Sequence, residues 1–316
     1  MSKIRSEDHI GRRLRFRDLQ VFSAVAQSGS MAKAAAQLGV TQPAVSEIVA
    51  GLERMFDVRL FDRSPRGVEL TSYGSVLLKR GVAVFDELKQ SIQDIEYLAD
   101  PTTGELRVGA AEPMLAGLLP AIIEHIHLKH PMISVQVRPL GAVAQIHRDL
   151  RERDVDLILS RMPQSPEEDL DNEILFYDRT LVVAGLNNAS TRRRKIKLAE
   201  LIDQPWILPP PDTVIGALIE GAFRTNGLDV PRRNVMTSSM QLHGALLVRG
   251  PYLSIFPSST LHFSAERMAL KTLPVDLGIP PWPIALTTLK NRTISPVAQL
   301  FIESAREVSK PLARQK

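Results

Sequence analysis

The sequence predicts a chain in two parts: a helical N-terminal head with a small β-hairpin, and a C-terminal region of α/β class, joined by one long helix. Three observations predict this order. Helical segments fill residues 14–56, a long helical pattern follows over 75–98, and strands alternate with helices after the Pro and Gly of 100–104. The alternation predicts parallel α/β units. Strands are expected over 105–110, 133–138 and 155–160, the next one only over 181–184, and a single helix over 115–129. With 316 residues, of which 44% are hydrophobic, the chain suits two or three compact units with real cores.

Two short helices are predicted within residues 30–56. The first, Met31 to Leu38, is rich in alanine, and Gly39 ends it because glycine readily adopts positive φ. Thr41 is a favourable N-cap for the second, and Pro43 falls in its first turn, where the missing N–H costs nothing. Two helices joined by such a tight turn are typical of a helix-turn-helix.

The second helix has an apolar and a polar face when each residue is advanced by about 100° around the axis. The apolar face holds Val45, Ile48, Val49, Leu52, Met55 and Phe56. The opposite face holds Pro43, Ser46, Glu47, Ala50 and Arg54, with Gln42 at the N-terminal end. A short polar face led by Gln and Ser is typical of a recognition helix in a DNA major groove. An ordinary amphipathic helical hairpin is the alternative.

A small hairpin is predicted directly after this helix. Apolar and polar residues alternate on both sides of the turn sequence 64–67, Ser-Pro-Arg-Gly. Its tip presents Arg63 and Arg66. In a winged helix-turn-helix such a tip lies against neighbouring phosphates.

The distribution of charge agrees with a DNA-binding head. Residues 1–67 contain eleven Lys or Arg and seven Asp or Glu, so this segment accounts for the whole net charge of +4. Residues 1–13 form a basic N-terminal tail, which either contacts phosphates or is simply solvated. The chain has no cysteine, no apolar signal segment and no apolar run long enough for a membrane, which predicts a cytoplasmic protein without disulfides or a membrane partner.

The long helix over 75–98 carries a narrow apolar seam. The residues of the seam follow a 4-3-3-4-3 spacing: Leu78, Val82, Phe85, Leu88, Ile92 and Ile95. A helix that packs on its own domain normally buries a broader face, so the seam favours contact with a partner helix. The Pro and Gly of residues 100–104 then indicate a hinge.

These segments together resemble the LysR-type transcriptional regulators, from about Leu14 to about Arg306. The resemblance is carried by SMAKAAAQLGVTQPAVSEIVAGLE, the wing sequence GVELTSYG, the long helix and the α/β region. It implies a winged helix-turn-helix DNA-binding domain, all-α with a small β wing, then a linker helix that forms a homodimer, and assembly to a homotetramer. The C-terminal part is expected to be a two-lobed α/β effector domain similar to type 2 periplasmic binding proteins.

The resemblance also sets the expected domain boundaries. They are a tail over 1–13, the DNA-binding domain over 14–74, the linker helix over 75–98, a hinge over 99–104 and the effector domain over 105–316. Lobe one is expected to take 105–174 and 279–316, and lobe two 175–278.

Residue roles in DNA binding follow as expectations from the exposed face and the resemblance. Gln42, Pro43 and Ser46 are expected to touch bases, and the backbone contacts are expected from Ser30, Arg63, Arg66 and Thr71. Family members often carry a basic residue where this chain has Glu47. Glutamate can accept from cytosine N4 but repels phosphates, so a different base preference is expected.

A small effector is expected beyond the carboxyl ends of the α/β strands, where helix N-termini offer free N–H groups. This rule nominates Ala111, Glu112, Met114, Val143 and Arg161 in lobe one and Pro210, Asp212, Thr213 and Ser239 in lobe two.

The chain departs from the family at the first of these positions. The family often has Ser or Thr near Ala111 to hold an effector carboxylate, whereas here alanine is followed by Glu112. Glu112 and Arg161 either form a structural ion pair or both face the cleft, where they would suit a sugar or polyol. The sequence also resembles the branch of the family that includes a regulator of sugar-binding-protein genes. The effector is therefore expected to be a sugar or a small organic acid, and no cofactor is expected.

The tryptophans and histidines have simple structural interpretations. Trp206 and Trp282 are expected in the core more than on a ligand, and the histidines, among them His243, are interpreted as helix-surface residues. A cytoplasmic solute-binding module without a DNA-binding role is the second hypothesis. An enzyme is the third, but the sequence has no nucleophile elbow, P-loop, GxGxxG after a strand or HExxH.

Overall fold

The computed structural model describes residues 14–64, 67–140, 143–162, 165 and 167–314, with side chains left out for 143–146 and 265–268. The chain divides into two compact units, Met1–Ser91 and Ile92–Lys316. Each unit is described by itself.

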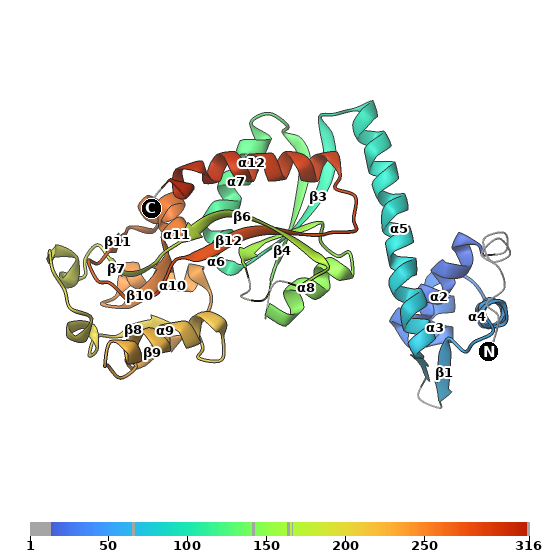
Figure 1. Cartoon of the computed structure of the whole chain (residues 1–316), viewed down its shortest axis with the longest axis horizontal. Coiled ribbons are helices and arrows are strands. Elements are labelled where there is room, and N and C mark those ends of the chain that lie inside the picture. Colours follow the sequence, from blue (N-terminus) through green and yellow to red (C-terminus); the bar gives the residue numbers. More distant parts are fainter. Residues whose placement is uncertain (1–13, 65–66, 141–142, 163–164, 166, 315–316) are drawn as a thin grey trace. The chain divides into compact units, whose positions relative to one another are not determined.

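The first unit contains the predicted helix-turn-helix and hairpin (Figure 1). Its elements are α2 (Phe16–Ser28), α3 (Met31–Leu38), α4 (Gln42–Phe56), β1 (Phe61–Ser64) and β2 (Gly67–Leu70). Gly39 ends α3 with φ of 66°, and the Thr41 hydroxyl accepts from the Ala44 N–H at 3.4 Å to begin α4. The sequence prediction for both ends of the turn is confirmed.

The core of this head is formed by one face of α4 packed on α2, α3 and β1. Val45, Val49 and Leu52 are buried, and the rings of Phe22 and Phe61 lie 5.0 Å apart. The predicted apolar face is therefore the inner face of the helix.

The long helix α5 spans Ser72–Ala99, wider than the predicted 75–98. It begins earlier because Thr71 acts as its cap: the Thr71 hydroxyl accepts from the Gly74 N–H at 3.0 Å. Within the first unit its Phe85 ring lies 6.1 Å from that of Phe16. The segment 99–104, predicted as a hinge, overlaps both neighbouring elements, because α5 ends at Ala99 and β3 already starts at Thr103.

The second unit contains two five-stranded sheets, one for each lobe (Figure 1). Lobe I has the order β4-β3-β5-β12-β6, with β3 (Thr103–Ala110), β4 (Met132–Pro139), β5 (Leu157–Arg161), β6 (Leu170–Asp178) and β12 (Trp282–Leu289). Lobe II has the order β11-β7-β10-β8-β9, with β7 (Thr180–Gly185), β8 (Trp206–Leu208), β9 (Arg233–Met236), β10 (Leu253–Pro257) and β11 (Leu270–Thr272).

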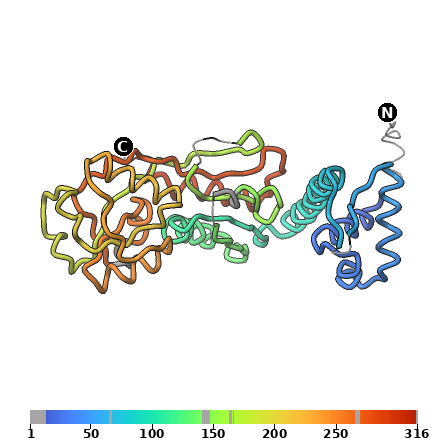
Figure 2. Tube along the Cα trace, turned by 90° about the horizontal axis from the view of Figure 1, so that it is seen from below, coloured from blue at the N-terminus to red at the C-terminus, as the bar shows by residue number. Residues whose placement is uncertain are grey.

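Helices pack on the sheets of both lobes. They are α6 (Glu112–Ala116), α7 (Leu118–His127), α8 (Val143–Arg151), α9 (Val214–Thr225), α10 (Met240–Arg249), α11 (Ser258–Met268) and α12 (Pro296–Ala313), with the short 3-10 turns η1 (Ala189–Arg192) and η2 (Leu198–Leu201). In Figure 2 the yellow-to-orange trace of lobe II forms one body, while the green and red traces of lobe I lie side by side. The two-lobed α/β fold class is confirmed.

Three details of the predicted α/β region were wrong. The sheets are mixed, because β12 runs antiparallel to β5 and β6 and β10 runs antiparallel to β7. The predicted lobe boundary after residue 174 cuts through β6, which stays in lobe I up to Asp178. A single helix predicted over 115–129 is broken into α6 and α7 at Gly117, where a Cβ would come within 2.9 Å of Thr260 Cα.

Two buried glycines of α5 provide a test of the packing between this helix and the wing. A Cβ at Gly74 would lie 2.1 Å from the Leu60 carbonyl oxygen, whereas a Cβ at Gly81 meets nothing within 4 Å. We expect Gly74→Ala to destabilise the head by about 1–3 kcal/mol. Gly81→Ala should stabilise it by about 0.5–1 kcal/mol, because alanine loses less backbone entropy in a helix. Scanning calorimetry of the full chain measures both, and equal shifts for the two variants would contradict the packing described.

Candidate nucleic-acid interface and effector site

The polar face of α4 lies on the surface of the head. Gln42, Pro43 and Glu47 are exposed and Ser46 is half-buried. The burial of the opposite face leaves this ridge open to a partner. The α4 ridge, as we call these four residues, has the size and polarity of a surface that enters a major groove.

The candidate contacts to the DNA backbone differ in the hydrogen bonds that their side chains already make within the protein. The Ser30 hydroxyl caps α3 by accepting from the Lys33 N–H at 3.4 Å, and a hydroxyl in that role still has a proton to donate. The Thr71 hydroxyl donates to the Arg59 carbonyl at 2.8 Å, so its proton is already engaged. A phosphate can only accept hydrogen bonds. The contact between Thr71 and a phosphate therefore stays a prediction, and it requires the Thr71 hydroxyl to turn away from the Arg59 carbonyl.

The wing carries the basic candidates. Arg63 is exposed, and its guanidinium lies 3.8 Å from the Glu53 carboxylate, a long contact that leaves its donors available. Residues 65–66, and with them Arg66, and the basic tail over 1–13 lie outside the described residues.

Glu53 fixes the position of the wing, which sequence reasoning missed. Its carboxylate accepts from the Leu60 N–H at 2.8 Å and from the Phe61 N–H at 3.3 Å. The sequence signal for this contact is an acidic residue among the apolar positions of α4. It does not reveal the partners, which lie seven and eight residues further along the chain. The contact ties β1 to the recognition helix.

In the second unit the carboxyl edges of the two sheets face each other. Strands β3, β4 and β5 are parallel and end at one edge of lobe I, while β8, β9 and β10 end together in lobe II. The Glu112 carboxylate, at the start of α6, accepts from the Met240 N–H of α10 at 3.1 Å. The Thr260 hydroxyl of α11 donates to the Pro113 carbonyl at 3.2 Å. These bonds join the lobes where the ligand-site rule places an effector.

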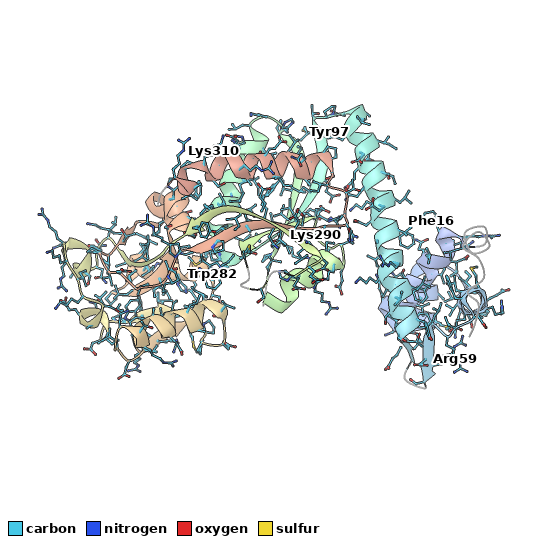
Figure 3. All side chains as sticks on the ribbon, in the orientation of Figure 1. Phe16, Arg59, Tyr97, Trp282, Lys290 and Lys310 are labelled. Carbon is cyan, nitrogen blue, oxygen red and sulfur yellow. The ribbon has the colours of Figure 1, made fainter. Side chains whose placement is uncertain are left out.

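Glu112 and Arg161 do not form the ion pair that the sequence left open. Glu112 bonds to Met240, and the Arg161 guanidinium lies 4.9 Å from the centroid of the Trp282 ring. Trp282, labelled in Figure 3 where β12 begins, donates its indole N–H to the Met162 carbonyl at 2.7 Å. Trp282 is half-buried and serves as a platform for the guanidinium.

Asp178, the acid whose charge acts on Arg161, is hydrogen-bonded to other residues. Asp178, at the end of β6, accepts from the Ser258 hydroxyl at 2.7 Å, the Ser259 N–H at 3.0 Å and the Ser259 hydroxyl at 2.5 Å. Burial lowers the pKa of the Arg161 guanidinium, and the Asp178 charge only partly opposes this. Sequence reasoning missed Asp178 because β6 was not predicted.

The remaining candidates for effector binding differ in burial and in the hydrogen bonds that they already make. Thr213 and Ser239 cap α9 and α10, accepting from the N–H groups of Gly216 at 3.1 Å and Leu242 at 3.3 Å. Met114 is buried in the lobe I core. Of the others, Ala111 precedes α6, Pro210 is half-buried, Asp212 is exposed, and the side chain of Val143 lies outside the described residues.

Two aromatic expectations had different outcomes. Trp206 is buried in lobe II with its ring edge-on to Phe223, as expected of a core residue. The interpretation of His243 as a surface histidine was wrong. Its ring is buried between the Ser254 hydroxyl at 2.7 Å and the Thr237 carbonyl at 2.9 Å, and burial lowers its pKa. Its partners lie on β10 and directly after β9 of the lobe II sheet, and a helical wheel of α10 does not reveal them.

The described residues contain no group of three or more His, Cys, Asp or Glu that could hold a metal ion. Among the same residues, no helix is long and apolar enough to span a membrane.

Glu53 and Glu47 form a matched pair for testing the wing anchor, because both lie on α4. Glu53→Ala leaves the Leu60 and Phe61 N–H groups without their acceptor, which should cost roughly 1–3 kcal/mol of head stability. Glu47 is exposed and has no bonded partner among the described residues, so Glu47→Ala should change stability by less than about 0.5 kcal/mol. Thermal unfolding by circular dichroism measures the difference; a stable Glu53→Ala head would show that the wing does not depend on this carboxylate.

Both parts of the chain match known protein families. Residues 99–310 match the model of the LysR substrate binding domain, and residues 16–75 match the bacterial regulatory helix-turn-helix of the lysR family. The uncharacterized HTH-type transcriptional regulator YdcI of Escherichia coli is 28% identical over 297 residues, which cover 93% of this chain and 96% of YdcI. GbpR of Azospirillum brasilense is 24% identical over 299 residues, covering 94% and 87%.

Solved structures agree on the fold. A full-length OxyR variant from Pseudomonas aeruginosa superposes with a TM-score of 0.66 at 20% identity, over 96% of this chain and 99% of that one. Full-length CbnR in complex with its target DNA gives 0.53 at 23% identity, over 94% and 100%. The chain belongs to the LysR family: it is a DNA-binding transcriptional regulator with an N-terminal helix-turn-helix domain and a C-terminal effector-binding domain.

Proposed function

We propose that the head reads its operator through the α4 ridge. The observation that carries the proposal is the orientation of α4, whose aliphatic face is locked in the core while Gln42, Pro43, Ser46 and Glu47 face outward. Gln42 is suited to bond bidentately to adenine, and Ser46 to several base edges. Glu47 would accept from cytosine N4, which favours a different sequence from that of relatives with a basic residue there.

The phosphate contacts belong to the elements around the ridge. Arg63 and Arg66 of the wing, Ser30 at the start of α3 and Thr71 at the start of α5 are the candidates. Such contacts fix the register of the head on the duplex but carry no base information. We infer that such a regulator acts in the cytoplasm and has no enzymatic activity, which its match to a family of DNA-binding regulators supports. The match to a helix-turn-helix family sets aside the solute-binding module.

We propose further that α5 joins two copies of the chain. On the C-terminal half of its seam, Leu88, Ile92 and Ile95 are 46%, 51% and 66% exposed, and the next apolar residue, Leu98, is 81% exposed. An apolar stripe of this length on one helix is stabilised by a partner helix. Two heads in a homodimer would meet two half-sites of the operator, and a homotetramer would span more of the promoter.

The effector site is proposed where the carboxyl edges of the two lobes meet. Glu112, Arg161 and Ser239 lie at that edge, and a small polar molecule, a sugar or a small organic acid, would contact both lobes there. A ligand that binds one arrangement of the lobes better than another shifts the population toward it. This shift is the proposed link between the effector and the affinity for the promoter.

Replacing Gln42 and Arg63 separates base reading from backbone contact. We expect Gln42→Ala to weaken the operator complex by roughly 1–3 kcal/mol and to lose discrimination at one base pair. Arg63→Ala should weaken all duplexes alike and reduce the salt slope by about 1. Fluorescence anisotropy with operator and scrambled duplexes over a salt series measures both. Equal, sequence-independent losses for the two variants would remove α4 as the reading element.

The seam of α5 is tested by a charge at its exposed C-terminal end. Ile95→Asp places an unpaired carboxylate in the proposed helix–helix contact and should lower the dimer affinity by about tenfold or more. Lys89→Ser, on the same helix at an exposed position outside the seam, is the control and should leave the mass unchanged. Light scattering after size exclusion gives the masses, and a dimeric Ile95→Asp protein would exclude this seam.

A further inference from the structure

We propose that the ligand between the lobes is a small zwitterion of the α-amino acid class, with its carboxylate on Arg161 and its ammonium group on Glu112. This inference rests on the proposed effector site and names the ligand class for it. Four observations carry it.

Arg161 ends β5, and Glu112 begins α6 directly after the neighbouring strand β3. The parallel strands β3 and β5 pair Ala110 with Leu159, and the Ala111 N–H still donates to the Leu159 carbonyl at 3.2 Å. Glu112 and Arg161 each follow that last pair by two residues. Neighbouring strands are about 5 Å apart, so the chain leaves the sheet side by side at these two residues, and opposite charges stand at one edge without bonding to each other.

Both side chains lie on the same side of the lobe I sheet. Leu157 and Leu159 of β5 belong to the core under α6 and α7, as do Ile284 and Leu286 of β12. Because side chains alternate along a strand, Arg161 and Trp282 continue that face beyond the end of the core. Glu112 begins α6, which covers the same face.

Arg161 is a half-buried cation without a bonded anion among the described residues. Its guanidinium rests on Trp282, and the one acid whose charge it senses, Asp178, has its oxygens occupied by Ser258 and Ser259. Burial lowers the pKa of Arg161, which reflects a charge removed from water without a full counter-charge. A ligand carboxylate would supply two parallel hydrogen bonds in the geometry that a guanidinium favours.

Glu112 fills the anion position at the start of α10 and leaves room for a cation. One of its oxygens accepts from the Met240 N–H, so a ligand carboxylate does not need to bind there. Its second oxygen has no partner among the described residues and can accept from an ammonium group. A ligand that satisfies both residues therefore carries one anionic and one cationic group, which distinguishes an amino acid from a simple acid or a sugar.

Thermal shifts of the full-length protein test the inference directly. The probes are the common L-α-amino acids, the matching acids without the amino group (propionate for alanine, glutarate for glutamate), the matching amines and D-galactose. A ligand that binds the folded state raises the unfolding midpoint. We expect at least one amino acid to raise the midpoint, and its deaminated acid and its amine to bind at least about tenfold more weakly by titration calorimetry.

Substitutions test which residue binds the ammonium group of the ligand and which binds its carboxylate. Glu112→Gln keeps an acceptor for the Met240 N–H but loses the charge, so it should remove the preference for the amino acid over its deaminated acid. Arg161→Gln should abolish binding of both. Arg179→Gln removes an exposed arginine next to the same lobe crossing and should change neither.

The outcomes separate this inference from the proposed site. If deaminated acids bind as well as amino acids and depend on Arg161, the site stands and the zwitterion is wrong. The same holds if D-galactose binds and both Glu112→Gln and Arg161→Gln weaken it. Ligands that bind without sensitivity to either substitution, or no shift with any probe, would overturn both.

Discussion

The burial of one aliphatic stripe of α4 is the constraint on which the function of the head depends. Val45, Val49 and Leu52 pack against α2, α3 and β1 with essentially no exposure. Each such side chain contributes roughly 1.5–3 kcal/mol when it leaves water, so the helix cannot rotate about its axis without a large loss. The polar ridge on the opposite side is therefore fixed outward, where the proposed contact with a duplex requires no rotation of the helix.

The wing is held in register with that ridge by a polar contact. The Glu53 carboxylate, on α4 itself, accepts from two N–H groups at the start of the hairpin. The α4 ridge and the wing, which are proposed to read bases and to bind phosphates, are thus tied directly to each other. Such coupling matters for specificity, because backbone contacts set the position from which the ridge meets the bases.

In the effector domain the arrangement of the lobes depends on the two places where the chain passes between them. The chain leaves lobe I at the end of β6 and returns at the start of β12, and these strands pair antiparallel along their length. This arrangement turns the carboxyl edges of the two sheets toward each other. It also brings Arg161, Trp282 and Asp178, which are far apart in sequence, to adjacent strand ends. Charges at this edge lie between two bodies whose relative arrangement a ligand can bias.

The sequence by itself determined the elements whose signals are local. The turn at Gly39, the cap at Thr41, both faces of α4, the hairpin around residues 64–67 and the seam of α5 follow from side chains within a few positions of one another. Only the tertiary structure decided the features made by distant partners. Strand β6 has weak local signals and owes its place to β12, the break at Gly117 arises from a close approach of α11, and Glu112 bonds to Met240 rather than to Arg161. Hydrophobic periodicity reports which side of an element is buried, but not which element buries it.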